Sequence, residues 1–148
     1  MSGAQTKIGI VEWSGRIRSG RSIEMRLSAT LGTWVPRVEE PAAKILLARH
    51  ARHFAWHADL WDALVPVLHD VVVPDGVSDP LLMEAVAALN EATQPLAVYD
   101  DVLPHLVAAY RDWASEASPV AERPIMRTLD LALRDVDFDA QEGHDHFS

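Results

Sequence analysis

The chain contains no cysteine, which excludes disulfide bonds, thiolate metal sites and cysteine nucleophiles. Basic residues are scarce as well: 13 stand against 22 acidic residues, and the formal net charge is −9. This charge argues against nucleic acid or an anionic membrane as a main partner, because both attract basic surfaces. No apolar run reaches the roughly 18 residues of a membrane span, and residues 1–15 lack the apolar core of a signal peptide. These absences favour a cytoplasmic protein.

The glycine patterns of nucleotide-binding loops and the G-x-S-x-G signature of hydrolases are absent too. What remains is a globular composition, with 148 residues of which 49% are hydrophobic. A chain of this length can bury one core, and no repeat or low-complexity stretch divides it. We therefore expect residues 1–148 to form a single domain.

Apolar residues recur at alternating spacings of three and four, the period of an α-helix with one inward face. Pro41 suits the first turn of the second helix, whereas Pro95 and Pro104 should kink the third helix or split it near its middle. Four such segments joined by short turns predict an all-α, up-down-up-down antiparallel four-helix bundle. The predicted helices cover about residues 7–34, 41–68, 80–115 and 120–142.

Two of these inward faces carry polar residues that need partners. On the first helix, Glu24 falls on the apolar face, one turn from Gly20, which leaves space for something other than a side chain. On the second helix, three imidazoles share one face with Leu47, Phe54 and Trp61. Three inward histidines within two turns are costly to bury unless a ligand or dense hydrogen bonding satisfies them. They are His50, His53 and His57.

Counting residues from the turns places these polar groups near one level of the bundle. Glu24 should face His50 and His53, because antiparallel helices rise equally per residue. Thr93 and Asp100 bracket the same level on the third helix. A substrate would enter at this level, through the kink at Pro95 and the space beside Gly20 of the first helix. On the fourth helix, acidic residues flank the inward Val136 and could reach in from the side, although none lies on the apolar face. These are Asp135, Asp137 and Asp139.

The arrangement of an inward glutamate opposite the segment H-A-R-H-F-A-W-H-A resembles that of the ferritin-like superfamily. In that superfamily, carboxylates and Glu-x-x-His pairs hold two iron or manganese ions. Glu24 matches the first-helix glutamate, and either His53 or His57 matches the second-helix histidine. The position three before His53 is His50, and the position three before His57 is Phe54, so the second helix lacks a Glu-x-x-His pair. The resemblance therefore implies a histidine-rich variant of the site.

We expect Glu24, His50, His53 and His57 to hold a metal ion, with iron first and zinc or manganese as alternatives. The resemblance implies an oxidase or oxygenase acting on a small organic molecule. Glu24 and His50 would take part in catalysis, and Asp100 would be an extra ligand or a proton acceptor.

Three alternatives stay open. Glu24 and the histidines could form a polar core network that fixes helix register, or a metal-free pocket with a histidine as general base. The bundle could also be non-catalytic and serve as a partner subunit, a scaffold or a small-molecule binder. An outward Trp56 beside Arg52 suggests a surface for a homodimer or a partner protein.

Overall fold

The computed structural model describes residues 9–65, 79–118 and 122–148. Most of these residues are helical and none forms a strand, so the all-α prediction is confirmed for them. Predicted helical residues 7–8, 66–68 and 120–121 lie outside the described ranges. A 3₁₀ turn, η1 (Leu89–Glu91), and a π-helical turn, η2 (Val98–Val102), accompany five α-helices. The helices are α1 (Ile10–Trp34), α2 (Pro41–Asp62), α3 (Pro80–Ala88), α4 (Leu103–Glu116) and α5 (Arg123–Phe147).

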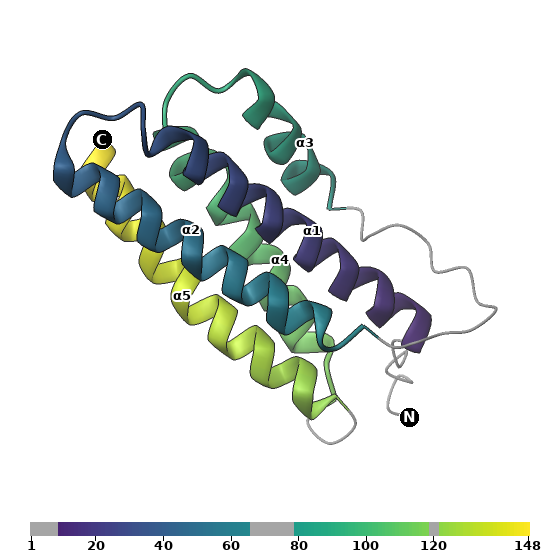
Figure 1. Cartoon of the computed structure of the whole chain (residues 1–148). Helices are drawn as coiled ribbons and strands as arrows, with labels where there is room; N and C mark the ends of the chain where they lie inside the picture. The colour runs from purple at the N-terminus through teal and green to yellow at the C-terminus, as the bar shows by residue number, and fades with distance from the viewer. Residues whose placement is uncertain (1–8, 66–78, 119–121) are drawn as a thin grey trace.

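Helices α1 and α2 form an antiparallel pair that buries the predicted apolar faces (Figure 1). Leu27 and Leu31 of α1 and Leu47 and Phe54 of α2 are fully buried in one core. Pro41 stands in the first turn of α2, as predicted, because its missing N–H is not needed there. The apolar period therefore identified both helices and the faces by which they pack.

The helix predicted over about 80–115, kinked or split near its middle, is split into α3 and α4, which run in opposite directions (Figure 1). Helix α3 passes into η1, and Ala92 then takes an extended conformation. Pro95 follows within three residues and disfavours helical geometry before it. Thr93, predicted to face inward, is exposed in this break. Pro104 starts α4 in its first turn instead of kinking a longer helix.

Contacts between side chains fix the directions of the long helices. Arg16 near the start of α1 binds Glu116 at the end of α4, and Glu24 binds Tyr110, so α1 and α4 are antiparallel. Helix α2 is also antiparallel to α1, so α2 and α4 run in the same direction. Helix α3, which lies between them in the sequence, runs in the opposite direction to both (Figure 1). This order differs from the predicted alternation, in which 80–115 would run opposite to α2.

Helix α5 was predicted to end at Gly143 but continues to Phe147. Gly143 is buried, and a Cβ atom there would overlap the ring of Tyr99. The glycine allows close approach of η2 to α5 and does not cap the helix. This contact sets the position of Tyr99 beside the polar cluster described below.

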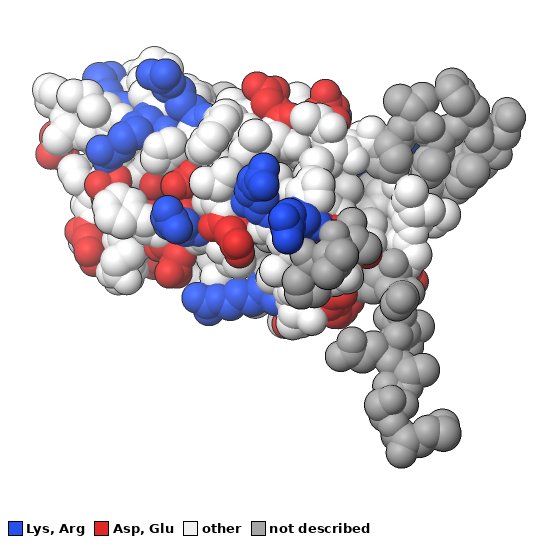
Figure 2. All heavy atoms as spheres, turned by 90° about the horizontal axis from the view of Figure 1, so that it is seen from below, with Lys and Arg blue, Asp and Glu red and all other residues white. Residues whose placement is uncertain are grey.

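Basic and acidic side chains are interspersed over the face of the molecule shown in Figure 2. Among the described residues, no helix combines the length and the apolar character that crossing a membrane requires.

Candidate metal centre

A ladder of histidine–carboxylate pairs joins α2 to α5. The histidines step along α2 by three and four residues, and the carboxylates step back along α5 by the same intervals, as antiparallel helices require. All three contacts fall within hydrogen-bond distance. The pairs are His50 Nε2–Glu142 Oε1 at 2.7 Å, His53 Nδ1–Asp139 Oδ2 at 2.6 Å and His57 Nε2–Asp135 Oδ2 at 2.7 Å.

Glu24 lies at one end of this ladder and is completely buried. Its Oε1 lies 2.7 Å from Nδ1 of His57. Its Oε2 accepts hydrogen bonds from Trp61 Nε1 and from the Tyr110 hydroxyl, both at 2.8 Å. The carboxylate is therefore satisfied by three donors within the core.

The predicted contact of Glu24 with His50 and His53 is not formed. Helix α1 ends at Trp34 and α2 begins at Pro41, as predicted, but the level at which the two helices face each other could be counted only to about one helical turn. The register shifts by about one helical turn, and His57 takes the place opposite Glu24. The space expected at Gly20 is filled as well, because a Cβ there would lie 3.1 Å from the Trp61 ring.

His57 stands between two carboxylates. Burial alone would lower the pKa of His57, but the hydrogen bonds and charges of Glu24 and Asp135 outweigh burial and raise it. The imidazolium form donates from both nitrogens, one to each carboxylate. In this arrangement, neither nitrogen of His57 is available to coordinate a metal ion.

His50, Asp139 and Glu142 form the group suited to a metal ion, because one ligand atom from each lies within 4.8 Å of the other two. His50 and Asp139 are fully buried, and Glu142 is partly buried. Oδ1 of Asp139 is buried without a hydrogen-bond partner, 3.4 Å from Nε2 of His50. A buried carboxylate oxygen left in this state is costly, and a cation would satisfy it.

The pKa values of this group reflect its burial. Burial raises the pKa of Asp139 and lowers that of His50, so the fold disfavours charge on both. Burial also acts to raise the pKa of Glu142, but hydrogen bonds from His50 and Arg49 lower it, so this carboxylate is ionised. A neutral imidazole is the form of histidine that coordinates a metal.

A second set of contacts orients the candidate ligands. The Tyr99 hydroxyl lies 2.8 Å from Nδ1 of His50, on the side of the ring away from Glu142. Burial raises the pKa of Tyr99, which keeps the phenol neutral and able to donate or accept. Arg49 Nη2 donates to Glu142 Oε1 at 2.5 Å. Such outer contacts hold the imidazole of a metal-ligating histidine in place.

The other predicted site residues lie apart from this group or at its edge. The His53 side chain is 32% exposed and reaches the group only through Asp139. Asp100 is exposed and pairs with His144 at 2.8 Å, so its carboxylate is not directed into the core. Trp56 is 46% exposed, as its outward position predicted.

Glu142 and Tyr99 were not among the predicted site residues, and Asp139 was expected only beside the apolar face. A signal was present, because Asp135, Asp139 and Glu142 are spaced by four and three, the reverse of the histidine spacing on α2. All three residues lie within the helix predicted over about 120–142, so this pattern could have been recognised from the sequence.

Comparisons with known proteins add no relative: no family model matches the chain, and neither the curated proteins nor the solved structures give a match.

Proposed function

We propose that His50, Asp139 and Glu142 hold one divalent transition-metal ion, and that the protein is a metal-dependent oxidoreductase acting on a small organic molecule. The observation that carries the proposal is the buried Oδ1 of Asp139, which has no hydrogen-bond partner in a group already rich in ligand atoms. His53 is the fourth ligand within reach, because it already contacts Asp139.

The ligand set favours iron, with zinc and manganese as alternatives. It combines imidazole with carboxylates and contains no sulfur, and mixed histidine–carboxylate sets with open positions suit iron(II) that reacts with oxygen. Such an ion supplies electrons or Lewis acidity to a molecule bound next to it. The chain holds His50 through Tyr99, and before a metal binds, the hydrogen bonds of His50 and Arg49 keep Glu142 ionised.

The order of the helices supports a ferritin-like four-helix bundle. Helices α2 and α4 run in the same direction and are joined by a long connection, and ferritin-like folds have one such crossover. The candidate site departs from that family, because its three ligands come from α2 and α5 and none comes from α1. We therefore propose a one-metal, histidine-rich site in place of a carboxylate-bridged pair of ions.

Metal analysis of protein prepared without a histidine tag tests the proposal. We expect about one equivalent of bound metal in the wild type and a loss of most of it in Asp139→Asn. Asp137→Asn is the matched control, because Asp137 is exposed on the same helix. Addition of iron(II) under air should consume oxygen faster with the wild type than with Asp139→Asn. A wild type that stays metal-free when iron(II), zinc or manganese is supplied contradicts the proposal.

A second candidate is a non-catalytic bundle that acts as a scaffold, a partner subunit or a small-molecule binder. One observation favours it: Glu24 accepts from three donors and both nitrogens of His57 are paired, as in a network that fixes helix register. In that case added metal should leave the melting temperature unchanged. The exposed Trp56 would then be the first place to look for a homodimer or partner contact, and a cytoplasmic location remains a prediction.

A further inference from the structure

A cavity of about 780 Å³ lies along the outer side of α2, next to the candidate metal centre. It is open to solvent, and every described residue that lines it belongs to α2. Two of its lining residues also contact the centre: Arg49 donates to Glu142, and His53 lies against Asp139. The cavity is lined by Ile45, Ala48, Arg49, Arg52, His53 and Trp56.

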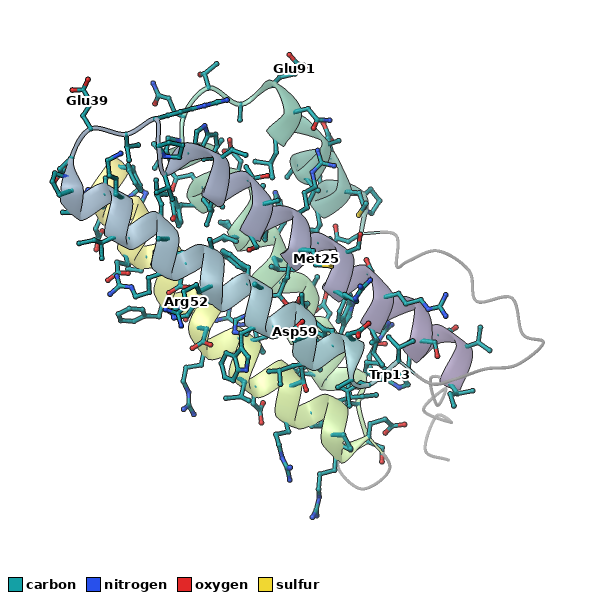
Figure 3. The ribbon with its side chains drawn as sticks, in the orientation of Figure 1. Trp13, Met25, Glu39, Arg52, Asp59 and Glu91 are labelled. Carbon is teal, nitrogen blue, oxygen red and sulfur yellow. The ribbon has the colours of Figure 1, made fainter. Side chains whose placement is uncertain are left out.

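The lining combines positive charge with apolar surface. Arg49 and Arg52 bring two guanidinium groups to one side of a chain whose net charge is −9. Arg52 projects from α2 (Figure 3) and makes no ion pair with any residue that the structure describes. Ile45 and Trp56 are 67% and 46% exposed beside them. A guanidinium next to an aromatic ring suits an anion with an apolar body.

We propose that this cavity binds a small organic acid, with the carboxylate on Arg52 and Arg49 and the apolar part on Trp56 and Ile45. The acid would be the substrate of the metal centre, so this inference rests on the proposed function. A molecule held there lies against His53 and Arg49, the two residues through which the cavity meets Asp139 and Glu142.

The acid should carry a single negative charge. Asp135, Asp139 and Glu142 lie along the adjacent α5, and each of them pairs with a histidine of α2. Their charge disfavours a multiply charged ligand such as a phosphate dianion. One carboxylate is matched by the two guanidinium groups.

Arg49 couples the cavity to the metal centre. Without a metal, Glu142 Oε1 accepts from both Arg49 and His50. A metal ion on Glu142 would neutralise this carboxylate and free Arg49 to bind the acid. Metal and acid should therefore strengthen each other's binding, and by linkage the factor is the same in both directions.

Calorimetric titration with zinc, which has no redox chemistry, tests this coupling with benzoate as the acid and benzamide as its neutral counterpart. We expect benzoate to lower the apparent Kd for zinc about fivefold or more and benzamide to leave it unchanged. Arg52→Gln should abolish the benzoate effect while zinc still binds in the absence of benzoate. Arg127→Gln, at an exposed arginine of α5 away from the cavity lining, is the matched control and should retain the effect.

The outcomes separate the two proposals. If zinc binds but benzoate has no effect, or acts equally in Arg52→Gln, the acid site is overturned and the metal centre stands. If zinc does not bind but metal-free protein binds benzoate in an Arg52-dependent way, the acid site stands and the proposed function fails. If neither ligand binds, both proposals are overturned.

Discussion

Oδ1 of Asp139 lies 3.4 Å from Nε2 of His50, with both side chains fully buried. This distance is too long for a strong hydrogen bond, and the oxygen has no other hydrogen-bond partner. A metal ion bound beside these two atoms would be coordinated by both of them. The proposed function follows from this relationship.

The metal-free protein should tolerate Asp139→Asn. Burial raises the pKa of Asp139, so its negative charge is unfavourable in the fold at neutral pH, and a neutral amide of the same shape removes that charge. We expect the free energy of unfolding to stay within about 1 kcal/mol of the wild type. Thermal melting with and without zinc checks this, and the stabilisation by zinc should disappear in the variant. A large loss of stability in the metal-free Asp139→Asn variant would show that Asp139 has only a structural role.

Glu24→Ala should be strongly destabilising. The substitution leaves the ring of His57, the indole N–H of Trp61 and the hydroxyl of Tyr110 without their buried acceptor. We expect a loss of roughly 3–5 kcal/mol in the free energy of unfolding, measured with urea. Glu24→Gln keeps the shape and one acceptor oxygen and should lose less. Equal stability of the alanine variant and the wild type would refute the buried network.

The stabilisation due to His57 should depend on pH. The pKa of His57 is raised in the fold, so its contribution is fully present below the unfolded value of about 6.5 and is lost as the pH rises through the folded pKa. Urea unfolding of the wild type and His57→Gln at several pH values above 6 measures this difference. The difference in the free energy of unfolding between the wild type and His57→Gln should become smaller as the pH rises. A gap that widens with pH would mean that His57 is neutral in the fold.

Gly143→Ala should destabilise the protein although alanine favours helices. A Cβ at this position overlaps the Tyr99 ring, which stacks on Phe147 and contacts His50. We expect a loss of roughly 1–3 kcal/mol and weaker metal binding, because Tyr99 must move. Gly32→Ala in α1 is the control: its added Cβ meets nothing within 4 Å, so a gain of up to about 1 kcal/mol is expected. If urea unfolding showed that the free energy of unfolding changes in the same direction in both variants, the packing argument would be contradicted.

The sequence predicted the fold well where the apolar period was unbroken. Helices α1 and α2, their buried faces and the inward positions of Glu24, His50 and His57 all follow from spacing of three and four. For the third predicted helix, the spacing and Pro95 left open whether it is kinked or split, and they did not show that α3 and α4 run in opposite directions. Reversal of the chain there depends on tertiary packing that local patterns do not encode.

The composition of the candidate site was predictable only in part. His50 was identified, whereas its partner Glu142 lay at the expected end of a helix that in fact continues through Gly143. That glycine was interpreted as a stop signal, although its role is to accommodate Tyr99. The pairing of Glu24 with His57 did not follow from the count, although the bounds Trp34 and Pro41 were predicted correctly, because an error of one helical turn in register exchanges one histidine for another.

The most direct test is a crystal structure of zinc-soaked protein with data collected at the zinc absorption edge. The account predicts one strong anomalous peak within coordination distance of His50 Nε2, Asp139 and Glu142, with no peak between Glu24 and His57. A peak that avoids Asp139, or well-ordered protein with no peak at this position, would contradict it.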